Sequence, residues 1–295
     1  MNTLRFASVD IGSNSVRLLF CNVTDSDAGV SFKKAELIRI PIRLGDDVFL
    51  KGRISKDKVD RLIMAMKAFN QLRKVFGAID YMACATSAMR EAANREEVVA
   101  KVKKETGIHI EVIDGKKEAQ LIYSNRQDDL LDPKNAYLFI DIGGGSTELT
   151  LWSKGKTIAS KSFNIGTIRL MYDKVERTTW NGFKEWIRAN TILDTPIIGV
   201  GSGGNINKLY KLADRKHDQP LTYKKLKSMS DALESMSMEE RIHGMGLNPD
   251  RADVIVPASK IMLAVMKNAH VKDLIVPQVG LSDGIIHALF NKRRK

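Results

Sequence analysis

One short motif occurs twice in this chain, as Asp10-Ile11-Gly12-Ser13-Asn14-Ser15 and as Asp141-Ile142-Gly143-Gly144-Gly145-Ser146. Each copy lies between two runs in which apolar and polar residues alternate, within residues 4–23 and residues 136–152. Such alternation around a glycine turn is typical of two antiparallel strands. The repeat predicts two related hairpins, each at the start of its own domain.

The residues of each loop predict an anion site with a carboxylate beside it. Glycine lets backbone N–H groups approach an anion closely, and the aspartate offers a ligand to a metal ion or a water. A single Asp-x-Gly turn is weak support, because structural hairpins often contain one. Two matched loops that face each other would hold successive phosphates of one chain, with Asp10 and Asp141 converging on a cation such as Mg²⁺.

Two familiar nucleotide-binding motifs do not fit these loops. Neither loop is followed by a helix, as a P-loop or a dinucleotide fingerprint requires. The spacing G-x-G-x-x-G does occur at Gly199–Gly204, after the apolar residues 196–198 and before a predicted helix. Because the polar residues 215–220 follow that helix in place of a second strand, the dinucleotide unit is incomplete. We therefore expect a third anion or nucleotide contact at the start of this helix.

Length and composition indicate a globular protein of about two domains. The chain has 295 residues, of which 43% are apolar and 28% charged, and ~100–200 residues per domain are usual. Its net charge of +12 would attract polyphosphate, nucleic acid or a highly charged nucleotide. We find no apolar run near the ~20 residues of a membrane helix and no signal-peptide core, so we predict a cytoplasmic protein without a membrane partner. Cys21 and Cys84 lie in apolar runs and are predicted to be buried, inert thiols.

Helices and strands alternate over much of the chain. Apolar periodicity predicts helices at 55–76, 87–105, 116–127, 205–212, 223–236 and 251–268, and further strands at 79–85, 109–113, 196–200 and 274–276. A polar stretch that contains Pro133 separates the two halves, so we place a domain boundary close to Asp128. The predicted domains are residues 1–127 and 128–295, and we leave open that a C-terminal helix at about 282–292 packs back on the first domain.

Several further segments share their residues with one known protein family. They are residues 43–45, 85–92, 118–119, 168–170, the loop at Gly201 and residues 251–254, in addition to Asp10–Arg17 and Asp141–Glu148. Together they resemble the exopolyphosphatase and guanosine pentaphosphate phosphohydrolase (Ppx/GppA) family, in a short two-domain form. The resemblance implies an α/β fold of two actin-like, ribonuclease H-like domains, as in sugar kinases and Hsp70, with duplicated hairpin phosphate loops and an interdomain cleft.

The resemblance also implies roles for individual residues. Glu118 matches the glutamate that activates the attacking water, and Asp141 and Glu148 match residues that bind Mg²⁺ or its water. Arg17 and Arg90 match arginines that neutralise phosphate oxygens. These roles agree with the chemistry, because phosphoryl transfer to water mainly needs positioning, an in-line water and positive charge around the transferred group.

The predicted site is the sum of these assignments. We expect Glu118, Asp141 and Glu148 to be catalytic, and Asp10, Asp141 and Glu148 to bind Mg²⁺ or another divalent cation. The predicted substrate-binding residues are Asp10, Gly12, Ser13, Asn14, Ser15, Arg17, Arg90, Gly143, Gly144, Gly145, Ser146, Gly201, Gly203 and Gly204. No histidine is assigned a catalytic role.

The chain departs from the family pattern at three places. Lys117, Asn205 and Ser282-Asp283 stand where the family often has Glu, Thr and Arg-Glu. Lys117, next to the predicted base, would lower the pKa of Glu118 and add phosphate affinity, or it would point to solvent. Both alternatives stay open at this point.

The leading hypothesis is a metal-dependent exopolyphosphatase that acts as a homodimer and binds no specific nucleic acid. The first alternative is a phosphohydrolase that removes the 5′ phosphate of guanosine pentaphosphate (pppGpp). Two further alternatives are a sugar-kinase-like ATP-dependent enzyme, which would need an acceptor, and an alarmone-binding sensor with negligible turnover. Hydrolysis in the absence of an acceptor would count against the kinase.

Overall fold

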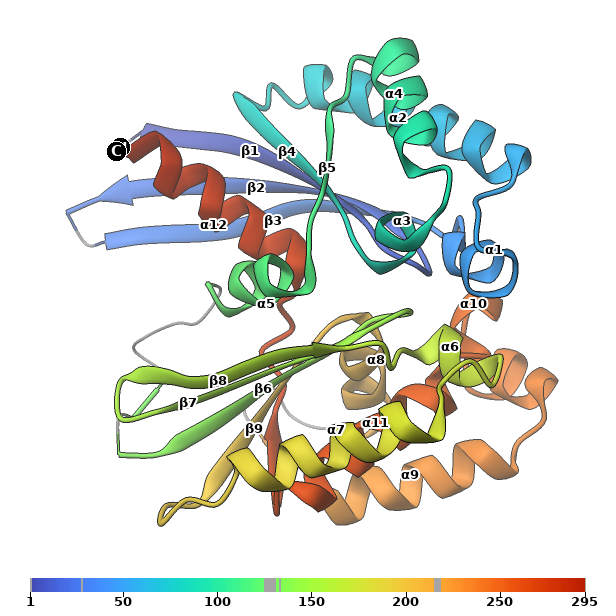
Figure 1. Cartoon of the computed structure of the whole chain (residues 1–295). Helices are drawn as coiled ribbons and strands as arrows, with labels where there is room; N and C mark the ends of the chain where they lie inside the picture. Colours follow the sequence, from blue (N-terminus) through green and yellow to red (C-terminus); the bar gives the residue numbers. More distant parts are fainter. Residues whose placement is uncertain (1, 28, 125–130, 133, 215–218, 295) are drawn as a thin grey trace. The chain divides into compact units, whose positions relative to one another are not determined.

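Two compact units make up the structure, a computed structural model that describes residues 2–27, 29–124, 131–132, 134–214 and 219–294 (Figure 1). Unit 1 comprises Met1–Asn125 and Leu281–Lys295, and unit 2 comprises Arg126–Gly280. The predicted boundary at Asp128 and the predicted helix end at Gln127 lie outside the described residues. Each unit has its own sheet and its own hydrophobic core.

The sheet of unit 1 has five strands in the order β3-β2-β1-β4-β5. The strands are β1 (Asn2–Ile11), β2 (Val16–Ser26), β3 (Gly29–Ile40), β4 (Asp80–Ala85) and β5 (Ile110–Val112). Strands β1, β2 and β3 pair antiparallel, whereas β4 pairs parallel to both β1 and β5. The first predicted hairpin is confirmed as β1–β2.

The helices of unit 1 differ from the prediction in two respects, an unpredicted helix at Leu44–Lys51 and the division of one predicted helix. They are α1 (Leu44–Lys51), α2 (Lys56–Val75), α3 (Ser87–Glu91), α4 (Arg95–Thr106), α5 (Gly115–Tyr123) and α12 (Leu281–Arg294). The single helix expected at 87–105 is wrong: Ala92 is extended, with φ −65° and ψ 125°, and divides it into α3 and α4. By contrast, α2 begins where the sequence indicated, because the Ser55 side chain accepts a hydrogen bond from the Lys58 N–H.

The C-terminal helix α12 belongs to unit 1. Phe290 makes edge contacts with Phe6 and Phe32, at centroid distances of 6.3 Å and 5.6 Å. The ring of His287 stacks on Phe32 at 3.8 Å. At the start of the helix, the Ser8 hydroxyl donates to the Ser282 carbonyl over 2.8 Å. The last segment of the chain therefore completes the core of the first unit.

The sheet of unit 2 repeats the pairing around the first hairpin. Its strands are β6 (Ala136–Ile142), β7 (Thr147–Ser153), β8 (Lys156–Phe163), β9 (Ile197–Ser202), β10 (Leu221–Thr222) and β11 (Asp273–Ile275), in the order β10-β11-β9-β6-β7-β8. Strand β6 pairs antiparallel with β7 and parallel with β9, as β1 pairs with β2 and β4. The second predicted hairpin is thus confirmed as β6–β7.

Most helices of unit 2 contact one largely buried helix. They are α6 (Thr167–Met171), α7 (Arg177–Asn190), α8 (Gly204–Leu212), α9 (Tyr223–Ser235), the π-helical turn η2 (Glu240–Gly244), α10 (Pro249–Ala252) and α11 (Ile255–Asn268). The helix expected at 251–268 is wrong in its first turn, because Asp253 and Val254 separate α10 from α11. Ile261, Val265 and Met266 of α11 are fully buried in the core.

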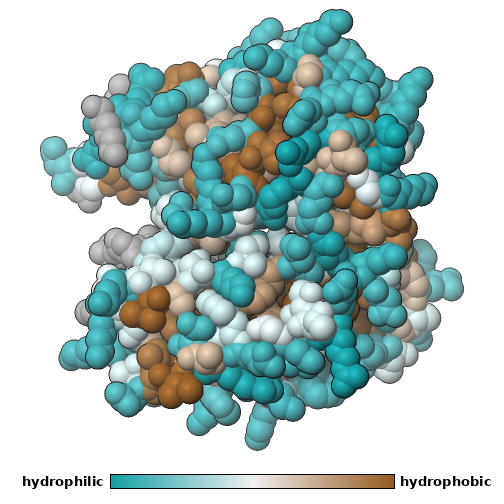
Figure 2. Space-filling model, viewed as in Figure 1, coloured by the Kyte–Doolittle hydropathy of each residue, from teal (hydrophilic) through white to brown (hydrophobic). Residues whose placement is uncertain are grey.

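The exposed face drawn in Figure 2 carries mostly hydrophilic side chains. Among the helices of the described ranges, none has both the length and the apolar character needed to span a membrane.

Candidate active site

The two hairpins place different charges at the same position. In the β1–β2 ladder Asp10 is paired with Arg17, and in the β6–β7 ladder Asp141 is paired with Glu148. Directly paired residues of antiparallel strands project from the same face with Cβ atoms ~4.5–5.5 Å apart. The first hairpin therefore brings together opposite charges, and the second brings together two carboxylates.

Loop 2 (Gly143–Ser146) is held by the start of α6. Three successive carbonyl groups accept hydrogen bonds: Gly143 from the Thr167 N–H at 3.0 Å, Gly144 from the Ile168 N–H at 2.9 Å, and Gly145 from Arg169 Nε at 2.7 Å. In a planar trans peptide, the C=O of one residue and the N–H of the next point in opposite directions. The N–H groups of Gly144, Gly145 and Ser146 are therefore directed away from α6. Successive amides with this orientation form an anion-binding concavity.

Gly166 makes the close approach of loop 2 possible. A Cβ atom at this position would lie 2.4 Å from the Gly144 oxygen and 2.5 Å from the Gly145 carbonyl carbon. Both are backbone atoms that cannot move aside, so only glycine fits. Sequence reasoning missed Gly166, and the one signal in the sequence is that this glycine lies just before residues 168–170, which resemble the family.

Loop 1 (Gly12–Ser15) is held in a similar way by the start of α1 and the residue that precedes it, Arg43. The Gly12 N–H donates to the Ser15 carbonyl over 3.1 Å, as Gly143 does to Ser146 over 2.9 Å. The Arg43 and Gly45 N–H groups donate to the carbonyls of Asn14 and Ser13, over 3.0 Å and 2.8 Å. By the same peptide geometry, the N–H groups of Asn14 and Ser15 point away from α1.

Asp10 is engaged by Arg17 within its own hairpin. Arg17 Nη1 donates to Asp10 Oδ2 over 2.8 Å, and the aspartate side chain is almost completely buried. Burial raises the pKa of the Asp10 carboxyl, and the charge and hydrogen bond of Arg17 act in the opposite direction. The two predicted site residues are therefore together, bound to each other.

Each carboxylate of the second hairpin is oriented by a serine. The Ser202 hydroxyl donates to Asp141 Oδ1 over 2.6 Å, and the Ser162 hydroxyl donates to Glu148 Oε1 over 2.8 Å. Serines that hold one oxygen of a carboxylate fix its direction toward a metal ion. Within the described ranges no three His, Cys, Asp or Glu side chains form a metal cluster. The pair nevertheless suits Mg²⁺, which usually takes one or two carboxylates and completes its shell with water and substrate phosphate.

Glu118 lies in the first turn of α5 and is buried, with 6% of its surface exposed. Arg90 Nη1 lies 3.4 Å from Glu118 Oε2 and donates to the Ile113 carbonyl over 2.8 Å. The structure thus brings the predicted base and a predicted phosphate-binding arginine into contact inside unit 1. Lys117 directs its ammonium to Glu111 on β5, with which it forms an ion pair.

The glycines at the junction of β9 and α8 have different neighbours. Gly203 has φ +95°, and a Cβ atom there would lie 3.0 Å from Asp141 Oδ1, so it adjoins the carboxylate pair. At Gly201 a Cβ atom would meet Ile206 at 3.0 Å, a contact of the core. The carbonyl of Gly204 accepts a hydrogen bond from Arg251 Nη1 over 2.6 Å. Of the predicted glycines in this loop, Gly203 is the one placed beside Asp141.

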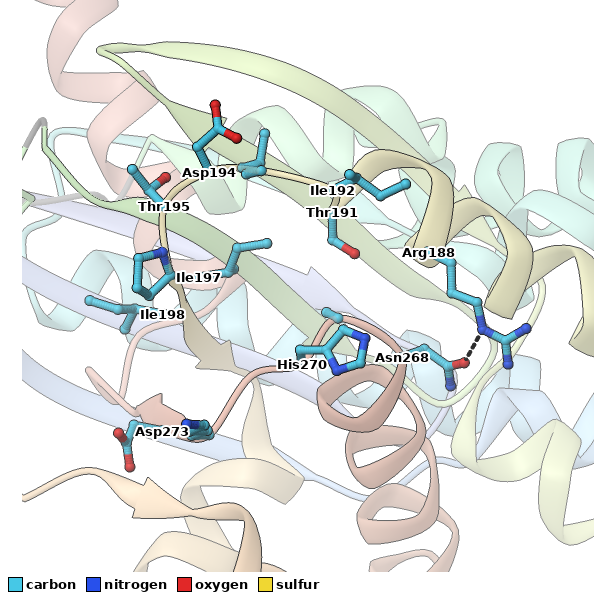
Figure 3. A pocket seen from close by; sticks show the side chains of 14 residues that line it. Arg188, Thr191, Ile192, Asp194, Thr195, Ile197, Ile198, Asn268, His270 and Asp273 are labelled. Carbon is cyan, nitrogen blue, oxygen red and sulfur yellow. Dashed lines mark hydrogen bonds between the residues drawn. The ribbon is translucent and has the colours of Figure 1, made fainter.

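A separate pocket of about 750 Å³ lies at the amino end of β9 (Figure 3). Ile197, Thr191 and His270 line it, and at its edge Arg188 Nε donates to Asn268 Oδ1 over 2.8 Å. Asp141 and Ser202 lie at the carboxyl ends of β6 and β9, where open α/β sheets bind their ligands. None of the predicted site residues lines this pocket.

The motifs and the duplicated hairpins agree with one family model. The model described as the Ppx/GppA phosphatase family matches residues 23–293. The chain belongs to the Ppx/GppA phosphatase family. The family-level prediction is therefore confirmed, and with it the two-domain actin-like α/β fold and an enzyme of the hydrolase class.

Similar proteins carry related names. Exopolyphosphatase 1 of Mycobacterium tuberculosis (strain H37Rv) is 26% identical over 303 residues, which cover 96% of this chain and 87% of the relative. A bifunctional 3-dehydroquinate synthase/phosphatase of Fusobacterium nucleatum is 28% identical over 315 residues. These cover 98% of this chain but 46% of that protein, so the chain spans about half of this longer relative.

Solved structures are similar along the whole chain. The Ppx/GppA family member of Aquifex aeolicus is 28% identical, with a TM-score of 0.77 and 100% of both chains covered. An exopolyphosphatase of Cytophaga hutchinsonii is 22% identical, with a TM-score of 0.82 and 98% of both chains covered. The second likeness is one of fold alone.

Proposed function

We propose that this protein is an exopolyphosphatase, which uses water to cleave the terminal phosphoanhydride bond of inorganic polyphosphate. The observation that carries the proposal is the second hairpin. Its loop directs three successive amides to one side, and the adjoining strands hold the carboxylates of Asp141 and Glu148 together. Amides bind phosphate oxygens, and the carboxylate pair attracts the cation that accompanies a phosphate chain.

Asp141 and Glu148 are assigned to a divalent cation, Mg²⁺ in the first instance. When bound, the ion supplies positive charge to phosphate oxygens during the reaction. The serine contacts of both carboxylates support this assignment, because they leave each group with a fixed orientation. Asp10 was also predicted as a ligand, and this stays a prediction, since Asp10 would have to share its carboxylate between Arg17 and the ion.

Glu118 is assigned the role of general base in unit 1. Its carboxylate removes a proton from the attacking water as the water's oxygen bonds to the terminal phosphorus, and the shortened phosphate chain leaves with the electrons of the cleaved P–O bond. Arg90, 3.4 Å from Glu118, keeps the carboxylate in place and brings a guanidinium to phosphate oxygens. The prediction that loops 1 and 2 hold one phosphate chain stays a prediction.

Relatives named exopolyphosphatase and the net charge of +12 add support for a polyanionic substrate. The N-terminus of α8 with Gly203 beside Asp141 favours a second candidate, pppGpp, whose phosphates would reach the same hairpin. The homodimer and the cytoplasmic location stay predictions.

The test is release of inorganic phosphate by the whole chain with Mg²⁺, from polyphosphates of several lengths and from pppGpp in parallel. Faster turnover of polyphosphate supports the proposal, and faster turnover of pppGpp makes the nucleotide hydrolase the better description. Phosphate release only when a sugar acceptor is added with ATP would indicate a kinase. Tight binding of pppGpp without turnover of any substrate would indicate a sensor.

A further inference from the structure

A lysine of α2 is turned inward, toward the segment that holds loop 1. The Lys58 side chain is 13% exposed, and its ammonium donates to the Arg43 carbonyl over 2.5 Å. It lies 3.2 Å from Asp47 Oδ1 and 3.8 Å from Asp46 Oδ2. Burying an ammonium group is costly unless it is paired and hydrogen-bonded, and these contacts meet that requirement.

The residue that Lys58 holds has an unusual backbone. Arg43 has φ 60° and ψ 50°, in the left-handed region. For a residue with a side chain this conformation is unfavourable, so neighbouring contacts must maintain it. The Arg43 guanidinium makes two hydrogen bonds to Asp46, at 2.7 Å and 3.0 Å, while Lys58 holds the Arg43 carbonyl from the other side.

This conformation is what connects α1 to loop 1. The left-handed turn at Arg43 allows the Arg43 and Gly45 N–H groups both to donate to loop carbonyls, over 3.0 Å and 2.8 Å. These bonds set the direction in which the amides of Asn14 and Ser15 point. A change in the backbone at residue 43 would therefore turn the amides of loop 1.

We propose that Lys58 is a positioning residue for loop 1, which keeps its amides aimed at phosphate without contacting the substrate. The Lys58 ammonium contacts the Arg43 carbonyl and the carboxylates of Asp46 and Asp47. Lys58 therefore acts through Arg43. The inference rests on the proposed function, since it assumes that loop 1 binds phosphate.

The test compares Lys58→Met with wild type in the full chain. Loss of a hydrogen bond from a charged group is expected to raise KM for polyphosphate about tenfold, with kcat changed much less. The conservative variant Lys58→Arg, which restores a cation beside Asp46 and Asp47, should recover most of the affinity. The matched control is Lys67→Met, which removes a charge from the same helix at a surface pair with Glu105 and should leave KM unchanged.

Two outcomes would overturn the inference. One is a folded Lys58→Met protein with the KM of wild type, and the other is an equal rise of KM in Lys67→Met, which would show a general effect of charge. If thermal unfolding shows that Lys58→Met does not fold, Asp46→Asn takes its place, because it removes the negative charge and one of the two acceptor oxygens that Asp46 offers to Arg43. A rise of KM in Asp46→Asn with kcat changed much less supports the inference, and an unchanged KM contradicts it.

Calorimetric binding of tripolyphosphate separates this inference from the proposed function. A wild-type protein that binds tripolyphosphate but hydrolyses nothing refutes the proposed hydrolase, and Lys58 is then judged by the dissociation constants alone. A weaker dissociation constant in Lys58→Met, restored in Lys58→Arg, still supports the positioning role. Equal dissociation constants in the three proteins contradict it.

Discussion

Arg17 and Glu148 occupy the same position in the two hairpins, opposite Asp10 and Asp141 respectively. One hairpin therefore neutralises its aspartate with an arginine 2.8 Å away, whereas the other sets a second carboxylate beside it. Like charges directly opposite each other destabilise a strand pair, and a bound cation reverses this effect. We therefore expect the two copies of the motif to have different tasks, with the carboxylate pair of the second the better suited to a metal ion.

This difference predicts how activity depends on Mg²⁺. Glu148→Gln is expected to raise the Mg²⁺ concentration for half-maximal phosphate release about tenfold or more, a loss typical of a disturbed metal site. Asp10 shares its carboxylate with Arg17, so Asp10→Asn should raise that concentration less than Glu148→Gln does. A larger shift in Asp10→Asn than in Glu148→Gln would place the ion at the first hairpin.

Gly166→Ala is predicted to destabilise unit 2. The added methyl group would meet backbone atoms of loop 2 at 2.4–2.5 Å, and such overpacking costs about 1–3 kcal/mol or more. Gly182→Ala on α7 is the control, since its Cβ atom meets nothing within 4 Å and should stabilise the helix by up to about 1 kcal/mol. Urea unfolding measures both free energies, and a Gly166→Ala protein as stable as wild type would contradict the packing at loop 2.

The free energy of unfolding is predicted to fall at acid pH because His287 becomes protonated. Burial lowers the pKa of this histidine, and the nearby Asp283, which pairs with Lys34, acts in the opposite direction. His287 takes up a proton less readily in the folded chain than in the unfolded chain. Its contribution to the free energy of unfolding is therefore complete above the unfolded pKa of about 6.5, and it is lost as pH falls through the lower folded pKa.

His287→Phe keeps a ring against Phe32 and removes the titration. Urea unfolding at several pH values between about 8 and 5 should show a shallower acid-side loss of stability in this variant than in wild type. If the free energy of unfolding depends on pH equally in the two proteins, His287 does not cause the loss of stability in acid.

Both cysteines are predicted to be unreactive in the native protein. Burial raises the pKa of Cys21 to about 11 and that of Cys84 to about 12, so the nucleophilic thiolate is scarce at neutral pH. A colorimetric thiol reagent should react slowly with the folded chain and rapidly with both thiols in urea. Rapid modification of either cysteine before unfolding would contradict their burial.

The hairpins were predictable because their signals are local. Alternating residues around a glycine turn define β1–β2 and β6–β7 without reference to the rest of the chain. Some helices were harder: neither α6, with five residues, nor α7, with 14, was predicted. A helix as short as α6 depends on tertiary contacts such as those with loop 2.

The candidate site was predictable only in part, for a related reason. Asp141 and Glu148 stand out in the motif, whereas Gly166 and Lys58 act through contacts with residues that are distant in sequence. The direction of Lys117 also depended on a neighbour in another element, since its partner Glu111 lies on β5. Motifs thus predict the residues with chemical roles, and the structure identifies those that hold them in position.

The most direct test of this account compares Glu118→Gln with Glu111→Gln in a phosphate-release assay on polyphosphate with Mg²⁺. Both variants replace a carboxylate of unit 1 by an amide, one at the buried partner of Arg90 and one at the half-exposed partner of Lys117. The account predicts that kcat falls by about 10²–10⁴-fold in Glu118→Gln, as expected for loss of a general base, and stays near wild type in Glu111→Gln. Equal rates for Glu118→Gln and wild type would contradict it.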